Sequence, residues 1–214
     1  MEKEIDPGIY MIVKAKRLAF ILEQLDHNNY CIIDDVFPCE LSLSLYQRLN
    51  DLYNKGTFKE ATIGKDRILD KSVRSDKIYW WNLFDLQYCE KKYIKYLKFF
   101  QKIFNRRFYI GTNRIEVFYS IYEQGTFYTK HYDNFKNSNK RKITFITYLN
   151  KEWKKYSTTN GELVIYEGDK EIFVEPLFNR TVIFFSEFVL HEVLPATQTR
   201  FAITSWFYTG FSYL

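Results

Sequence analysis

Three side chains in the second half of the chain have the types and spacing of a metal site. His131 and Asp133 are two residues apart, His191 follows far along the sequence, and Arg200 lies nine residues beyond His191. Two imidazoles and one carboxylate form the ligand set of a non-haem Fe(II) site that keeps coordination positions open. An arginine near such a site is suited to an anionic co-substrate, because its guanidinium binds carboxylates through two parallel hydrogen bonds.

The spacing of His131 and Asp133 places both on one face if the segment is a strand, since side chains two apart point the same way. A His-x-Asp triplet also arises by chance, and a single histidine is more often a surface or core residue. This chain has three histidines, of which His27 lies at the end of an expected helix. A structural zinc site is disfavoured, because such sites are closed by four ligands, often cysteine.

Arg200 opens the run Arg-Phe-Ala-Ile-Thr-Ser-Trp-Phe-Tyr, in which alternate residues share a face. If that face lines a barrel, the arginine is a buried charge that requires an anion. The alternative is a structural salt bridge to an acidic side chain. On the run 143–149, Thr144, Ile146 and Tyr148 alternate in the same way, so Tyr148 could donate to the same anion. Together these residues indicate an Fe(II)- and 2-oxoglutarate-dependent oxygenase.

The elements that would position this site are helices first and strands second. Apolar spacing predicts helices over residues 8–26, 40–53 and 85–105, with a short strand at 30–33. Short β-branched and aromatic runs separated by turn residues predict strands at 113–119, 128–131, 142–149, 162–166, 171–175, 181–185, 190–194 and 200–208. We therefore expect an α+β fold with a double-stranded β-helix (jelly-roll) core and N-terminal helices packed on one sheet.

The domain organisation expected from this order is one compact domain of two parts. Residues 1–111 would form a helical and strand support with a mobile loop at about 61–75. Residues 112–210 would form the jelly-roll core that carries the metal and the co-substrate. A chain of 214 residues is long enough for one large core and short for two domains.

Composition limits the class of protein. The chain is 46% hydrophobic and 20% aromatic, so it needs a buried core. Its net charge of +5 comes without a long basic block, which disfavours nucleic acid as a partner. The cysteines are three and lack a CxxC pair, which predicts reduced thiols in a reducing cytosol. No apolar run predicts a signal peptide or a membrane span, so we expect a cytoplasmic protein.

Several segments beyond the metal ligands resemble the prolyl 4-hydroxylase branch of the 2-oxoglutarate/Fe(II)-dependent oxygenases. The similarity is closest to the hypoxia-inducible-factor prolyl hydroxylases and their bacterial relatives, and its order and spacing extend over most of residues 10–210. The segments that carry it are residues 73–80, 130–134, 147–153, 161–166 and 191–207.

The resemblance implies a role for each matching residue. His131, Asp133 and His191 would bind iron, while Arg200 and Tyr148 would hold the distal carboxylate of 2-oxoglutarate. Tyr122 would approach the co-substrate near the metal. Arg74 and Asp76 would anchor the loop over the substrate. The pocket would be lined by Ile146, Leu163, Val193, Thr204 and Trp206.

The implied activity is hydroxylation of a prolyl residue in a protein, with Fe(II), 2-oxoglutarate and O2 consumed to give succinate and CO2. Ascorbate is a candidate reductant, and a translation factor is a candidate protein substrate. Two alternatives remain open at this point. The substrate could be a free amino acid or small metabolite, or the chain could be a non-catalytic binding module of the same fold.

Overall fold

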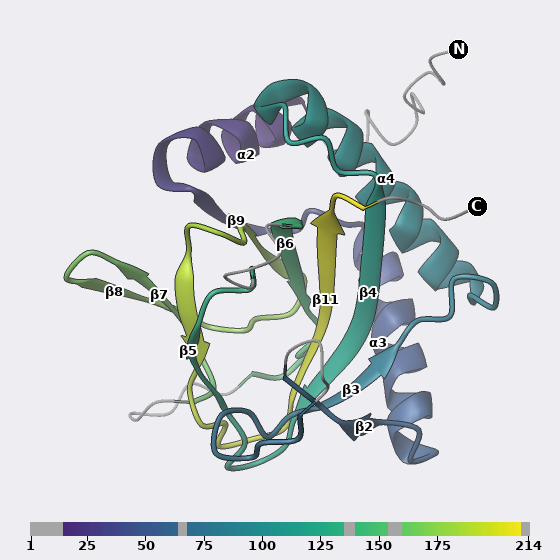
Figure 1. Ribbon diagram of the computed structural model, residues 1–214. Helices are drawn as coiled ribbons and strands as arrows, with labels where there is room; N and C mark the ends of the chain where they lie inside the picture. Colours follow the sequence, from purple (N-terminus) through teal and green to yellow (C-terminus); the bar gives the residue numbers. More distant parts are fainter. Residues whose placement is uncertain (1–14, 64–67, 135–139, 154–159, 211–214) are drawn as a thin grey trace.

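The computed structural model describes residues 15–63, 68–134, 140–153 and 160–210 (Figure 1). Its helices are α2 (Ala15–Asn28), α3 (Cys39–Asn54) and α4 (Tyr88–Phe108). Its strands are β1 (Tyr30–Asp34), β2 (Lys59–Glu60), β3 (Lys77–Trp80), β4 (Arg114–Tyr122), β5 (Tyr128–His131), β6 (Arg141–Tyr148), β7 (Leu163–Glu167), β8 (Lys170–Val174), β9 (Arg180–Phe185), β10 (Leu190–Val193) and β11 (Arg200–Tyr208). None of the described helices is long and apolar enough to cross a membrane.

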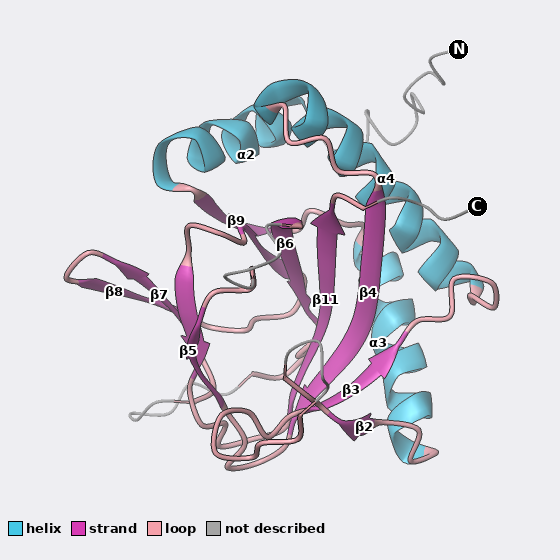
Figure 2. Ribbon diagram, viewed as in Figure 1, coloured by secondary structure: helices cyan, strands magenta, loops and turns pink. Residues whose placement is uncertain are grey.

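The strands form two antiparallel sheets. The larger sheet has the order β1-β9-β6-β11-β4-β3-β2, and the smaller has the order β5-β10-β7-β8. Figure 2 shows the three helices on one side of the larger sheet and the smaller sheet on its other side. This arrangement confirms the predicted jelly roll with helices packed on one sheet.

The strand β6 shows how alternation separates two cores. Ile143 and Phe145 belong to the cluster between the larger sheet and the helices, where Phe145 packs against Phe100 of α4. Ile146 and Tyr148 belong to a second cluster between the two sheets. The expected shared face of Ile146 and Tyr148 therefore points away from the helices and toward the smaller sheet.

Helix α4 is the longest helix, and local signals fix both of its ends. At its start, the backbone N–H of Gln87 donates to the carboxylate of Glu90, which satisfies one of the free donors of a helix N-terminus. At its end, Tyr109 adopts the left-handed conformation with φ of 54°, which stops the helix. The predicted helix ended at residue 105, one turn early, because no glycine marks the end.

The N-terminal half contributes strands as well as helices to the larger sheet. Strand β1 pairs with β9 at one edge, and β3 pairs with β4 near the other. The two predicted parts of the domain therefore share one sheet, and their boundary at residue 111 stays a prediction. Of the predicted loop at 61–75, residues 64–67 lie outside the described residues, as do residues 8–14 of the first predicted helix.

Candidate metal centre

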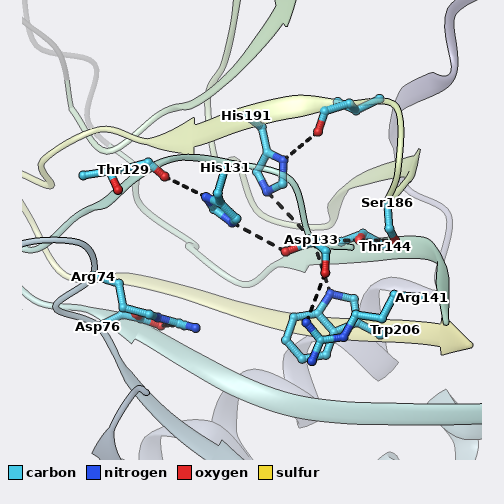
Figure 3. Close-up of polar contacts among 11 residues, drawn as sticks. Arg74, Asp76, Thr129, His131, Asp133, Arg141, Thr144, Ser186, His191 and Trp206 are labelled. Carbon is cyan, nitrogen blue, oxygen red and sulfur yellow. Dashed lines mark hydrogen bonds and ion pairs between the residues drawn. The ribbon is translucent and has the colours of Figure 1, made fainter. Parts of the chain in front are cut away.

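Strands β5 and β10 bring the two distant histidines side by side. His131 ends β5 and is the direct antiparallel partner of His191 on β10. Asp133 lies two residues beyond His131, just past the end of β5, whose bounds match the predicted strand at 128–131. Its Oδ1 lies 3.5 Å from Nε2 of His131, and its Oδ2 lies 3.9 Å from Nε2 of His191 (Figure 3). One ligand atom from each residue lies within 4.8 Å of the others, a spacing suited to a metal ion.

Backbone carbonyls orient both imidazoles. Nδ1 of His131 lies 2.7 Å from the carbonyl of Thr129, and Nδ1 of His191 lies 3.1 Å from the carbonyl of Val189. Since a carbonyl only accepts, each Nδ1 donates, and Nε2 is the nitrogen of each ring that faces Asp133. The ring of Tyr128 stacks on that of His131 with centroids 3.6 Å apart. These contacts prepare both rings to bind a metal through Nε2.

The carboxylate of Asp133 is fixed from the larger sheet. The hydroxyl of Thr144 donates to Oδ2 at 2.7 Å, and the indole N–H of Trp206 donates to the same oxygen at 3.2 Å. Ser186 forms a hydrogen bond of 2.8 Å with Thr144, and Arg141 donates to the backbone carbonyl of Asp133. The sequence indicated only that Thr144 and Trp206 lie on inward faces, so these roles were missed.

The protonation states suit a metal ligand set. Burial by itself would raise the pKa of Asp133, but the neighbouring His131, His191 and Thr144 outweigh it and hold this pKa well below its usual range. Burial and the adjacent His131 lower the pKa of His191 to about 4. At neutral pH the carboxylate is therefore charged and this imidazole neutral. Among the described residues, no histidine, cysteine or acidic side chain joins these three as a fourth ligand, which leaves coordination positions open.

Arg200 is a buried cation without a counter-charge. It is 2% exposed and begins β11, opposite Tyr122 of β4. Its Nη2 donates to the hydroxyl of Tyr148 at 3.3 Å, and its guanidinium lies 4.7 Å from the Tyr122 ring centroid. Across the described residues no carboxylate pairs with it, and its Nε has no hydrogen-bond partner. The structural salt bridge is thus absent from the described structure, and an anionic ligand is what the site requires.

A pocket joins the metal centre to Arg200, in the space between the two sheets. All five residues predicted to line it do so, and Tyr148 reaches Arg200 from beside it. Phe118, Ser120 and Tyr128 also line it and were not predicted. The full lining is Arg74, Phe118, Ser120, Tyr122, Tyr128, His131, Asp133, Ile146, Leu163, His191, Val193, Arg200, Thr204 and Trp206.

Arg74 and Asp76 form a buried ion pair at the mouth of the pocket. Nε and Nη2 of Arg74 donate to the two carboxylate oxygens of Asp76 at 2.8 and 2.7 Å. The guanidinium also lies 4.3 Å from the centroid of the Tyr128 ring. Burial would lower the pKa of Arg74, but Asp76 outweighs it and keeps the guanidinium charged. Arg74, which also forms a β-bridge with Tyr128, thus fixes the end of the 61–75 segment against the strand that carries His131.

Comparisons with known proteins agree with this geometry. Residues 117–208 match the 2OG-Fe(II) oxygenase superfamily. Egl nine homolog 1 from Rattus norvegicus is 30% identical over 200 residues, which are 89% of this chain and 58% of that protein. The chain spans about half the length of the curated relatives that it matches first.

Two solved structures resemble the fold closely. A prolyl-4-hydroxylase from Pseudomonas putida has a TM-score of 0.81 and 25% identity, and the match covers 91% of this chain and 100% of that one. A prolyl hydroxylase from Trichoplax adhaerens, solved in complex with a hypoxia-inducible-factor oxygen degradation domain peptide, has a TM-score of 0.76 and 25% identity. That match covers 96% of this chain and 94% of the other.

Proposed function

We propose that this chain, whose residues 117–208 match the 2OG-Fe(II) oxygenase superfamily, is a dioxygenase that hydroxylates a prolyl residue in a protein. The observation that carries the proposal is the pairing of an open His-Asp-His group with a buried, unpaired arginine in one pocket. The names of the relatives that it resembles support proline as the target.

The donor set fits a ferrous ion. Two imidazole nitrogens and one carboxylate are the ligands that non-haem Fe(II) takes while it keeps positions open. Bound there, the iron would couple decarboxylation of 2-oxoglutarate by O2, which gives succinate and CO2, to insertion of one oxygen atom into a substrate C–H bond.

The side chains around the metal bind and orient the co-substrate. Arg200 would pair with the distal carboxylate of 2-oxoglutarate, and Tyr148 would donate a hydrogen bond to it, since burial raises the pKa of this phenol and keeps it protonated. Tyr122 would close the side of the pocket next to Arg200. Ile146, Leu163, Val193, Thr204 and Trp206 would exclude water from the reacting atoms. No side chain is assigned as a general base.

A protein rather than a free amino acid is the proposed substrate, because the relatives include a structure with a peptide bound. Arg74, which the buried pair with Asp76 holds in place, lines the pocket and could contact a bound peptide. Within this proposal, a translation factor is the candidate substrate, ascorbate the candidate reductant and the cytoplasm the location. These three rest on the resemblance and on the free cysteines alone.

The test measures succinate release with Fe(II) and 2-oxoglutarate, with either free proline or a proline-containing peptide as substrate. Release with the peptide and not with free proline is expected. Release with free proline alone would assign the site to a small molecule, and no release with either or with host lysate would reject the oxygenase. Mass spectrometry of the host proteome with and without the gene would then locate the proline that gains one oxygen atom.

A further inference from the structure

A second, larger groove lies at the other end of β4 from Arg200. It encloses about 790 Å³ and lies between β4, the end of β3 and helix α4. Trp81, Leu86, Ile94 and Val117 provide its apolar surface. Trp81 is 7% exposed, and its buried indole N–H has no hydrogen-bond partner among the described residues. The groove therefore offers apolar surface, which is typical of a binding site.

One wall of the groove is an open strand edge. Strand β3 pairs with β4 only from Phe118 to Ile121, and beyond Trp80 a single bond joins Trp81 N–H to the Val117 carbonyl. Figure 1 shows β3 ending beside the middle of β4, so that the rest of β4 has only β11 as a strand neighbour. The Arg114 carbonyl already accepts a hydrogen bond from the side chain of Gln101. The edge over Ile115 and Glu116 can accept another extended segment through backbone hydrogen bonds.

The opposite wall is positively charged. Lys91, Lys95 and Lys98 all line the groove, and their spacing places them on one face of α4. None of the three forms an ion pair within the described part of the chain. Arg114 adds a fourth positive charge, whereas the one acidic residue in the lining, Glu116, accepts a hydrogen bond from Tyr208. The charge of the groove is therefore complementary to an acidic partner.

Exposed apolar side chains extend the groove onto the surface. Trp80 is 47% exposed and Leu83 is 51% exposed, and both line the groove. Phe84, in the same loop, is fully exposed. Large apolar side chains gathered in this way beside a groove mark interaction surfaces.

We propose that this groove binds an extended segment of the protein substrate in which acidic and apolar residues alternate. Backbone hydrogen bonds to Ile115 and Glu116 would add the segment as a strand. Its acidic side chains would face the three lysines of α4, and its apolar side chains, on the opposite face of the added strand, would cover Trp80. The inference rests on the proposed function, because it takes the occupant to be part of the substrate.

Aromatic contacts connect the groove to the metal pocket. The ring of Trp80 lies 4.7 Å from that of Phe118 and 5.9 Å from that of Trp206, measured between centroids. Phe118 and Trp206 line the metal pocket, and Trp206 donates to Asp133. A substrate that enters the pocket near Trp206 can therefore continue past Trp80 into the groove.

The binding test uses a fluorescein-labelled hexapeptide of alternating Glu and Val without proline, measured by fluorescence anisotropy at low salt. The full chain is compared with K91Q/K95Q/K98Q and with the matched variant K16Q/K55Q/K170Q, which changes three exposed lysines far from the groove. We expect the groove variant to bind at least tenfold more weakly and the matched variant to bind normally. Two control peptides should bind poorly. One has Lys in place of Glu and so carries the wrong charge, and the other is the Glu–Val peptide N-methylated at alternate residues, which removes backbone donors.

Equal binding by the two triple variants would overturn the proposal, and so would undiminished binding of the N-methylated peptide. A concentration-dependent dimer that only the groove variant loses in sedimentation would assign the groove to a second copy of the chain instead.

A turnover test separates this inference from the proposed function. A proline peptide is compared with the same peptide extended by the Glu–Val segment. The extension should lower KM about tenfold for the wild type and the matched variant, but not for the groove variant. If the extension leaves all three KM values unchanged, the inference fails while the prolyl hydroxylase remains. If neither peptide is turned over, the proposed function fails, and the anisotropy measurement still decides whether the groove binds an acidic strand.

Discussion

At the scale of single residues, Asp133 is the most constrained group of the metal centre. Its carboxylate faces both histidines and receives hydrogen bonds from Thr144 and Trp206. These two donors come from strands of the larger sheet, whereas the histidines come from the smaller one. Asp133 therefore couples the two sheets at the point where a metal would bind, and its position is set before any metal arrives.

Replacing His131 by Ala should abolish metal binding. Loss of a hydrogen-bond partner of a ligand alone costs about 10- to 100-fold in metal affinity, so loss of the ligand itself costs more. Calorimetric titration with Mn(II) measures this, and succinate release should vanish in parallel. His27→Ala is the matched control, because His27 lies exposed on α2. An unchanged affinity in the first variant would remove His131 from the metal site.

Replacing Arg200 by Lys should raise KM for 2-oxoglutarate. Lysine keeps the charge but loses the planar pair of donors, at a cost of about 1.5–3 kcal/mol, or roughly 10- to 100-fold. Arg180→Lys is the control, since Arg180 binds Asp34 through two hydrogen bonds away from the pocket. If both variants keep the wild-type KM in steady-state kinetics, Arg200 does not bind the co-substrate.

Residue types and the alternation of side chains along strands predicted part of the site. The rest depends on contacts between segments that are distant in the sequence. The spacing of His131 and Asp133 and the isolated arginine are visible in one dimension. The hydroxyl of Thr144 on Asp133 and the Tyr128 ring on His131 depend on which strands become neighbours. Strand order is set by packing over the whole sheet, and no local pattern carries it.

At the scale of elements, the bounds of strongly alternating strands were predictable, and those of weak strands were not. Strands β5 and β11 begin and end where their alternation predicts. Two strands flanking the loop are also expected within residues 57–81, and β2 and β3 lie there, but the two-residue β2 takes its bounds from pairing with β3. The segment between them ends in Arg74 and Asp76, whose pairing holds it against β5.

Replacing Asp76 by Asn should destabilise the fold. The change leaves the guanidinium of Arg74 buried without its counter-charge, which costs about 3–5 kcal/mol in the free energy of unfolding. Urea denaturation measures this. Asp85→Asn, at an exposed position in the loop before α4, serves as the control and should stay within about 0.5 kcal/mol of the wild type. An equally small effect at Asp76 would show that the pair contributes little to stability.

At the scale of the whole molecule, the larger sheet separates stability from chemistry. The helices pack on one face through the cluster that includes Phe100, Phe145 and Phe207. The metal pocket lies on the other face, between the sheets. Side chains of one strand point alternately to the two faces. A substitution in the helix layer therefore affects the metal pocket only if it shifts the backbone of the sheet.

Replacing Phe100 by Ala should lower stability and leave the site intact. The side chain is fully buried, and its loss should cost about 3–5 kcal/mol in the free energy of unfolding. Affinity for Mn(II), measured where the variant is folded, should stay at the wild-type value. Phe84→Ala is the control, because Phe84 is fully exposed. A large loss of metal affinity in Phe100→Ala would contradict the separation of the two faces.

The position of β11 has a consequence for biosynthesis. It is the last described strand along the chain, yet it lies in the middle of the larger sheet between β6 and β4. During synthesis, β4 and β6 leave the ribosome long before β11, the strand that lies between them. Until β11 is made, their apolar faces stay exposed to solvent. Folding of such a topology is slow and begins after most of the chain is made, so nascent chains of this protein should depend on chaperones that shield β-rich intermediates.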